Sequence, residues 1–324
     1  MKTRLLRLSG VALMAVATTF SASLLSAAPT RVVRRGAPGR VEAASAAAVS
    51  YSVEVPIVTR VVGSALFRTA IDISNNTNNA VTARYQYSYN RATTAGGFFR
   101  SPVQAISLLP FDNFHSDDFV AYLGTIPNAL ESGASDSSFG TLLVTFDGLP
   151  SSQGWEGTVF ARTYSPNPTG IGTVAIAYPA SLFFESANQT LVATIRDTQL
   201  APSVAGALRT NIGIRNTDIR GTTLTVTVQL GFFDVTAGSP TSGHRVGNLL
   251  TISNLAPGEV RQLSNVRAAA AIPDNVTTML VFADVVNPTA TSPTIEGYVN
   301  ILDGGTQDGA FFEMKCADTD GCGS

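Results

Sequence analysis

The stretch that decides the fold is FRTAIDISN, residues 67–75, because it returns as LRTNIGIRN, residues 208–216. A second fragment repeats in the same order: EGTV at 156–159 returns as EGYV at 296–299. The two copies lie 141 and 140 residues apart. A repeat that keeps its order and spacing determines the architecture more strongly than any local signal does. The sequence therefore predicts two similar modules of about 130 residues each.

Each copy carries the alternation of a half-buried β-strand. Ile71 and Ile73 fall on one face of the first copy, with polar residues between them. Residues 223–230, TLTVTVQL, alternate in the same way. The segments 75–79, NNTNN, and 216–221, NTDIRG, separate such runs and are rich in residues that favour turns. The predicted fold class is therefore all-β, with an antiparallel β-sandwich in each module.

One short helix is expected in each module. Ser116 precedes Asp117 and Asp118, and we expect it to cap a helix over residues 117–123 with these acids in the first turn. The matching stretch in the second module is 265–271, NVRAAAA. The fold prediction is thus two β-sandwiches with one short helix in each.

The N-terminal segment, residues 1–28, has the pattern of a secretory signal peptide. Lys2, Arg4 and Arg7 are followed by an apolar run over 8–25 and then by small residues. A membrane anchor is the alternative, but the apolar run is at the short limit for a span. No second run of this kind follows in the sequence. We expect a secreted chain (extracellular, periplasmic or cell-surface) with no membrane span after signal cleavage.

The remainder of the chain divides into four parts. They are a flexible linker over 29–50, module one over 51–186, module two over 187–316 and a C-terminal tail over 317–324. Cys316 and Cys322 are the two cysteines of the sequence. In an oxidising compartment we expect them to form a disulfide that ties down the tail.

Composition limits the class of partner. The chain has 44% hydrophobic and 14% charged residues, with a formal charge of −2. Basic residues concentrate in the first 50 positions, so residues 51–324 carry 14 basic and 22 acidic groups. Nucleic-acid binding needs clustered Lys and Arg. An acidic folded part therefore argues against nucleic acid as a partner.

The repeated unit also carries a family resemblance. The motif RTxIxIxN at 68–75, its copy at 209–216 and the helix start DDFV at 117–120 resemble uncharacterised secreted bacterial proteins built from tandem immunoglobulin-like β-sandwich modules. The resemblance covers most of residues 51–316. It implies export and modular display, and it implies no set of catalytic residues.

Two charged positions are duplicated with the repeat. Arg68 recurs as Arg209, and Glu156 recurs as Glu296. We expect a structural ion pair between Arg68 and Glu156 and another between Arg209 and Glu296, each joining one strand to another. The alternative is four exposed charges without a shared role.

Few residues offer catalytic or metal-binding chemistry. His115 and His244 are the only histidines, and no Gly-x-Ser-x-Gly elbow is present. The segment HSDD at 115–118 has no counterpart in module two, and His244 falls in a predicted exposed hairpin loop. DTDG at 318–321 begins like a calcium loop but lacks the remainder of that motif. We expect no catalytic residue, no cofactor and no metal.

A possible ligand surface consists of aromatic side chains outside the predicted core. Phe98 and Phe99 follow two glycines in a loop, and Trp155 precedes the EGTV fragment. The tyrosines of 85–89, YQYSY, alternate on one face of a strand and are expected in the core instead.

The sequence thus predicts a secreted, non-enzymatic interaction or scaffold protein that displays loops on two β-sandwich modules. Its expected partner is an unknown protein or polysaccharide at the cell surface. A carbohydrate-binding module protein is the alternative. A glycosidase that uses a pair of carboxylates is the third possibility.

Overall fold

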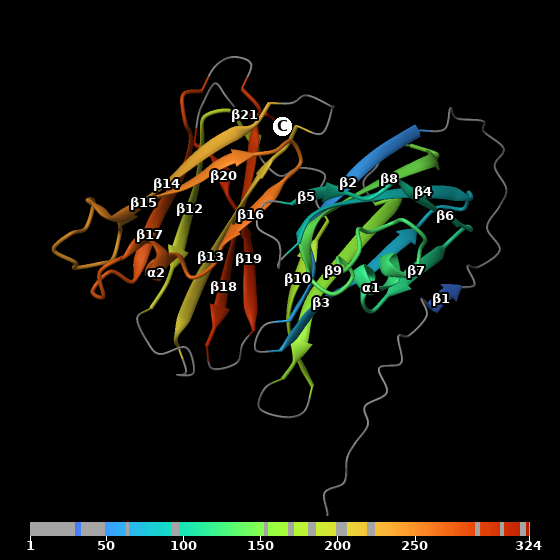
Figure 1. The fold of residues 1–324 in the computed structure, drawn as a ribbon, viewed down its shortest axis with the longest axis horizontal. Coiled ribbons are helices and arrows are strands. Elements are labelled where there is room, and N and C mark those ends of the chain that lie inside the picture. The colour runs from blue at the N-terminus through green and yellow to red at the C-terminus, as the bar shows by residue number, and fades with distance from the viewer. Residues whose placement is uncertain are drawn as a thin grey trace, which may run out of the picture.

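The computed structural model is an all-β chain of antiparallel sheets with two short helices (Figure 1). The structure describes residues 30–33, 49–62, 65–91, 97–151, 155–167, 172–180, 186–198, 206–218, 224–288, 292–304, 308–317 and 322–323. The predicted signal peptide over 1–28 and the DTDG segment at 318–321 lie outside these residues.

The elements of the first half follow one another along residues 30–179. They are β1 (Thr30–Val33), β2 (Val49–Val62), β3 (Leu66–Asn75), β4 (Val81–Arg91), β5 (Phe98–Arg100), β6 (Gln104–Leu108), β7 (Asp112–Ser116), α1 (Phe119–Gly124), β8 (Ser138–Leu149), β9 (Gly157–Pro166) and β10 (Thr173–Pro179).

The second half runs from residue 186 to residue 323. Its elements are β11 (Ser186–Ala187), β12 (Thr190–Arg196), β13 (Leu208–Asn216), β14 (Val226–Asp234), β15 (Arg245–Leu255), β16 (Val260–Leu263), α2 (Val266–Ala270), β17 (Thr278–Val285), β18 (Ile295–Asp303), β19 (Gly309–Glu313), β20 (Lys315–Cys316) and β21 (Cys322–Gly323).

The two halves show the same pattern of strand pairing. In the first half, one layer has the order β2-β8-β4-β6 and the other has the order β7-β3-β9-β10. In the second half, the corresponding orders are β12-β17-β14-β15 and β16-β13-β18-β19. The last residues of β2 also pair with β3, which links the two layers of the first half.

This order shares two strand pairs with the constant-type immunoglobulin sandwich and places three strands differently. If β2, β3, β4, β6, β7, β8 and β9 are lettered A to G, the pairs B–E and C–F are present. Strand A, however, pairs along most of its length with F, G pairs with B, and D pairs with C. The constant-type order places A beside B, G beside F and D beside E. The first and last strands have therefore exchanged layers relative to that order, and strand D lies in the layer of C.

Each half has its own hydrophobic core. The tyrosines at 85–89 lie in the first core and are at most 2% exposed, so their predicted core position is confirmed. Within its own half the first core extends along the chain to Tyr178, and the second begins at Ala187. Val260 and Tyr298 belong to the second half but pack in the first core.

The repeated asparagine makes equivalent hydrogen bonds in both halves. Asn75 and Asn216 end β3 and β13, and both are buried. The side-chain amide of Asn75 donates to the buried carbonyl oxygen of Leu108 at 3.4 Å, and that of Asn216 donates to the buried carbonyl oxygen of Leu255 at 3.1 Å. Because buried carbonyl groups need partners, this asparagine has a structural reason to appear in both copies.

The two predicted helices are present, but one cap was assigned wrongly. Asp118 caps α1 by accepting the backbone N–H of Ala121 at 3.1 Å, whereas Ser116 is the last residue of β7. In the second half α2 lies within the predicted stretch 265–271, and Asn265 caps it. Neither of the helices in the described part of the chain has the length and apolarity needed to cross a membrane.

The predicted linker over 29–50 is also corrected in part. β1 lies within it and pairs with β7, with Thr30 opposite His115, and β2 already begins at Val49. The residues of β1 include two valines, which favour strands. One edge of β7 pairs with β3, and β1 occupies the other edge.

Candidate functional site: the joint between the two halves

The two copies of the repeat differ mainly at positions that point away from their own core. The inward positions are threonine, two isoleucines and asparagine in both copies. The outward positions 70, 72 and 74 are alanine, aspartate and serine, whereas the second copy has Asn211, Gly213 and Arg215. These positions are half-buried in β3 and fully buried in β13. The outward face of β13 is therefore covered by residues that do not belong to the core of its own sandwich.

The first half supplies that cover. Among the described strands β10 pairs only with β9, so one of its edges is open toward the second half. β19 packs along β10 (Figure 1). The ring of Phe311 meets that of Tyr178 edge-on, with centroids 5.2 Å apart. The side-chain amide of Asn90 donates to the carbonyl oxygen of Val260 at 3.0 Å. Because open strand edges promote aggregation, this contact also protects the first sandwich.

Gly213 shows how the second copy was adapted to this contact. The ring of Tyr298 lies over it, and an added Cβ would stand 2.0 Å from the Cζ atom of that ring. The Tyr298 hydroxyl donates to Oε1 of Gln262 at 3.2 Å. The aspartate of the first copy at this position, Asp72, would not fit.

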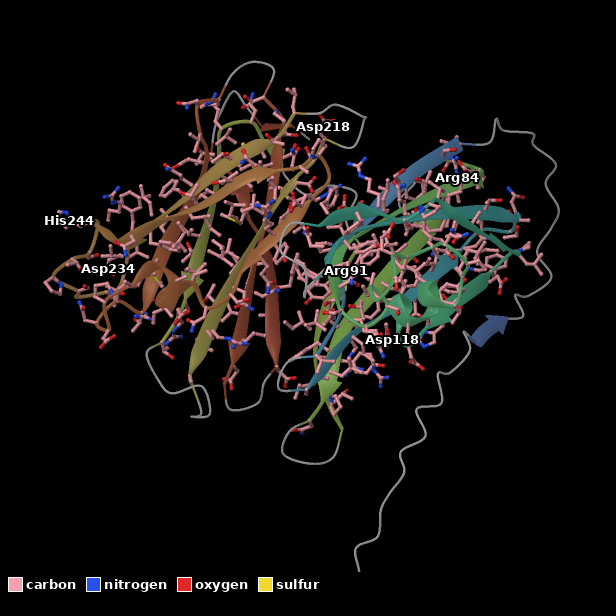
Figure 2. The ribbon with its side chains drawn as sticks, viewed as in Figure 1. Arg84, Arg91, Asp118, Asp218, Asp234 and His244 are labelled. Atoms are coloured by element: carbon pink, nitrogen blue, oxygen red, sulfur yellow. The ribbon has the colours of Figure 1, made fainter. Side chains whose placement is uncertain are left out.

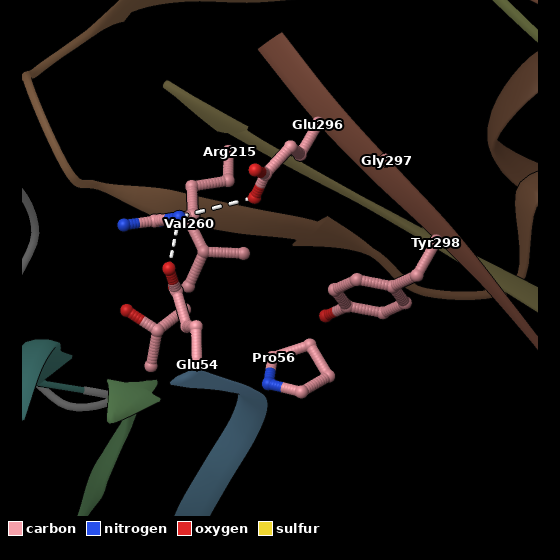
Figure 3. Close-up of a pocket in the computed structure, with 8 residues that line it drawn as sticks. Glu54, Pro56, Arg215, Val260, Glu296, Gly297 and Tyr298 are labelled. Atoms are coloured by element: carbon pink, nitrogen blue, oxygen red, sulfur yellow. Dashed lines mark hydrogen bonds and ion pairs between the residues drawn. The ribbon is translucent and has the colours of Figure 1, made fainter. Parts of the chain in front are cut away.

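A buried cluster of charges joins the halves near this ring (Figure 3). Nη1 of Arg215 bonds to Oε2 of Glu54 from β2 and, at 3.0 Å, to Oε2 of Glu296 from β18. Burial raises the pKa of Glu54 to about 7; Arg215 opposes this rise, and Glu296 adds to it. Burial also raises the pKa of Glu296, against the opposing effect of Arg215. Oε1 of Glu54 and Nε of Arg215 are buried without a hydrogen-bond partner.

A glycosidase also uses two neighbouring carboxyls, one of them with a raised pKa, whereas burial raises the pKa of both carboxyls in this cluster. The space bordered by Glu54, Arg215 and Glu296 is only about 10 Å³. This is about the volume needed for one water molecule. A sugar ring does not fit there, so this cluster acts as a joint between the halves.

A larger cleft of about 310 Å³ lies elsewhere between the two halves. This volume is within the range of small-molecule sites, which often form where two domains meet. Its wall from the first half is mainly apolar and aromatic, with Ile57, Val61, Phe67, Phe139, Ile176 and Tyr178. Its wall from the second half is mainly polar, with Arg209, Asn211, Gln262, Ser264 and Asn300. The cleft therefore offers unlike surfaces to the two sides of a ligand.

Strand register arranges the polar wall. Asn211 on β13 lies directly opposite Asn300 on β18, and Arg209 lies two residues before Asn211 on the same face. Asn300 is 3% exposed, and its Oδ1 atom has no hydrogen-bond partner. Oδ1 of Asn211 accepts the backbone N–H of Asn265 at 3.0 Å, which leaves its amide N–H groups to point elsewhere.

The predicted ion pair between Arg68 and Glu156 is wrong. Arg68 lies opposite Tyr164, whereas Glu156 immediately precedes Gly157, which lies opposite Asn75. The two charges thus sit near opposite ends of a strand pair, roughly 25 Å apart at about 3.3 Å per residue. The guanidinium of Arg68 instead lies 4.8 Å from the ring centroid of Tyr164.

The predicted pair between Arg209 and Glu296 is wrong for the same reason. Arg209 lies opposite Leu302, and Glu296 lies opposite Arg215, six residues along β13. Glu296 is nevertheless paired, because Arg215 replaces the serine of the first copy. Glu156 accepts hydrogen bonds from the backbone and side chain of Ser151.

The aromatic candidates do not form one platform. Phe99 stacks on Tyr89 of the core with centroids 5.7 Å apart, and Phe98 lies opposite Asn90 near the end of β4. Trp155 is 62% exposed and lies just before β9, where its carbonyl accepts from the side chain of Asn76. Asn76 belongs to the turn before β4, so Trp155 is at the other end of that strand.

The histidines lie apart from the cleft. Nδ1 of His115 is 2.9 Å from Asp72 and its Nε2 is 3.0 Å from Asp117. Burial lowers the pKa of His115, but the hydrogen bonds to these carboxylates raise it more, so it ends above 6.5. His244 lies in the exposed loop between β14 and β15, as predicted, and Figure 2 places it with Asp234 at the outer end of the second half. Among the described residues no group of three side chains could hold a metal ion.

Cys316 is disulfide-bonded. The backbone of β21, which contains Cys322, pairs with β11, whereas Cys316 lies opposite Leu191 of β12. The side chain of Cys322 is outside the described part of the structure, so the pairing of these two cysteines stays a prediction.

No protein-family model matches this chain, and no curated protein matches its sequence. The site therefore has to be understood from its own geometry. Sequence reasoning missed Glu54, Asn211, Arg215 and Asn300. Asn211 and Arg215 could have been found from the sequence, because they occupy outward positions at which the two copies of the repeat differ.

Proposed function

We propose that the chain is a secreted, non-enzymatic binding protein. In this proposal, residues 51–186 and 187–316 are two tandem β-sandwich modules of immunoglobulin-like type that act as one body. The matching strand pairs and the two separate cores support the modular part of the proposal. The buried Arg215 cluster and the packing of β19 on β10 support the joined arrangement.

The observation that carries the proposal is the cleft of about 310 Å³ between the modules. Its two walls come from different modules, so only the joined molecule offers a complete site. The lining combines apolar side chains with a few polar groups, which is the usual composition of ligand sites. Display of this site outside the cell is the function we assign to the two modules.

Secretion is proposed from the N-terminal pattern of basic, apolar and small residues. The disulfide at Cys316 agrees with an oxidising compartment.

The test is a binding screen with the mature chain and a variant whose cleft is filled. Ser264 is an exposed residue of the polar wall, so Ser264→Trp should block the cleft without disturbing a core. We expect ligands from a glycan array and a fragment library to raise the melting temperature of the wild type and not that of the variant. Ligands that stabilise both proteins equally, or a wild type that binds nothing, would overturn the proposal.

A further inference from the structure

We propose that the cleft between the modules binds an acidic sugar, meaning a small saccharide with a pyranose ring that carries a carboxylate. This inference rests on the proposed function, because it names the ligand of the same cleft. Three features of the lining carry it: an arginine that forms no ion pair with another described residue, a pair of asparagines facing each other, and an apolar wall.

Arg209 would pair with a negatively charged group of the ligand. It is exposed and lines the cleft, and no ion pair among the described residues includes it. Its electrostatic influence reaches Asp197, but Nε of Arg267 already binds that carboxylate at 2.9 Å. A guanidinium donates two parallel hydrogen bonds to a carboxylate. A ligand carboxylate would therefore meet a cation that forms no ion pair with a described residue, since Asp197 is already bound by Arg267.

The two asparagines call for a hydroxyl group. The amide nitrogen of Asn211 remains a donor, because its Oδ1 is already engaged by the backbone N–H of Asn265. Oδ1 of Asn300, directly opposite, is an acceptor without a partner. A hydroxyl is at once a donor and an acceptor, so a single hydroxyl can satisfy both side chains. The terminal torsion of asparagine is soft, which lets Asn300 turn toward such a group.

The opposite wall calls for an apolar face. Phe67, which is 39% exposed, lines this wall with Ile176 and Tyr178. A pyranose ring presents C–H groups on one face and hydroxyls at its edge. The ring can therefore lie against the apolar wall while its edge meets Asn211 and Asn300.

Other ligand classes satisfy only part of this lining. A fatty acid would fill the apolar wall and neutralise Arg209, but it would leave the asparagine pair without hydrogen bonds, which is costly in a desolvated site. A neutral sugar would satisfy the asparagines and leave Arg209 unpaired. A carboxylated sugar is the class that uses all three features.

The test is isothermal titration of the mature chain with three sets of probes. They are hexuronates of gluco, galacto and manno configuration, the matching neutral hexoses, and hexanoate. We expect at least one hexuronate to bind, its neutral hexose to bind at least tenfold more weakly, and hexanoate not to bind. Arg209→Gln should weaken the hexuronate to the level of the hexose and leave the hexose unchanged. Arg245→Gln is the matched control, because Arg245 is exposed at the start of β15 and does not line the cleft.

The outcomes separate this inference from the proposed function. If the hexuronate and its hexose bind equally, or if Arg209→Gln leaves the hexuronate affinity unchanged, the acidic-sugar inference fails while ligand binding stands. If only hexanoate binds, the inference also fails, because the asparagine pair then has no role. If no probe binds and the wider screen finds no cleft ligand, the proposed function itself fails.

Discussion

Replacing Glu54 with glutamine tests how the two halves are joined. Glu54, Arg215 and Glu296 bring two carboxyls and one guanidinium together in a buried place. Burial and the neighbouring Glu296 outweigh the attraction of Arg215 and raise the pKa of Glu54 from 4.5 to about 7. Glu54→Gln removes one negative charge and keeps the pair between Arg215 and Glu296. The variant therefore isolates the cost of ionising Glu54 at the joint.

The sign of the effect follows from proton linkage. Because the pKa of Glu54 is higher in the folded state, the folded chain binds more protons than the unfolded chain between pH 4.5 and about 7. The contribution of Glu54 to the stability of the wild type is complete below pH 4.5 and is lost as the pH rises through about 7. At about 1.4 kcal/mol per pH unit, the displacement of this pKa corresponds to about 3 kcal/mol. We expect the free energy of unfolding of Glu54→Gln, relative to wild type, to rise by about 3 kcal/mol between pH 4.5 and pH 8.

The assay is urea denaturation at several pH values from 4.5 to 8, followed by circular dichroism. Comparing the two proteins cancels the contributions of titrating groups outside the cluster, and the measured difference therefore reports on Glu54 together with its neighbour Glu296. Asp136→Asn is the control, since Asp136 is 81% exposed and should leave the pH dependence unchanged. A stability difference between Glu54→Gln and wild type that stays constant across this range, or falls with pH, would refute the assignment of a strained buried carboxyl at the joint.

Three further substitutions test the fold around the site. Gly213→Ala should lower the free energy of unfolding by about 1–3 kcal/mol, because the added Cβ would overlap the ring of Tyr298. Gly231→Ala is the control and should cost less than about 1 kcal/mol, because the nearest atom to its added Cβ is 3.5 Å away. Equal costs for the two variants would contradict the packing of Tyr298 over Gly213. Asn216→Ala should cost about 1–3 kcal/mol because it leaves buried carbonyls unpaired, and a cost below about 0.5 kcal/mol in urea denaturation would argue against that role. The pKa of His115 is raised, so the stability that this histidine adds is complete below pH 6.5 and is lost as the pH rises through its folded pKa. An NMR titration should give a pKa above 6.5 for His115. A value at or below 6.5 would refute the double contact with carboxylates.

Sequence reasoning reached the parts of the fold that depend on neighbours in the chain. The alternation at 69–75 predicts strand β3, and the same pattern at 85–89 places three tyrosines in the core. The stretch 265–271, which matches the first predicted helix, contains α2, and Asn265 caps it. In the first half, β7 extends through Ser116, so the cap moves two residues on to Asp118.

The candidate site was beyond such reasoning because it depends on register and on the meeting of two faces. The order of Arg68 and Glu156 in each copy says nothing about which residue lies opposite them on the neighbouring strand. Antiparallel pairing places them near opposite ends of β3 and β9. Glu54 has no duplicated charged counterpart to mark it, and its partner Arg215 comes from the other half. Only the joined structure brings these residues together.

The residues that contact the other half lie at the positions where the two copies of the repeat differ. Inward residues must remain the same kind in both copies, because each half keeps a core of its own. Outward residues are free to change. In the second copy, position 211 places an amide in the cleft, position 213 leaves room for a tyrosine ring, and position 215 binds two glutamates. Arg209 keeps the identity of Arg68 yet changes its surroundings from the ring of Tyr164 to the cleft. If the cleft binds the ligand that we propose, binding should therefore respond to changes at Arg209 and Asn211 and not to the equivalent changes at 68 and 70.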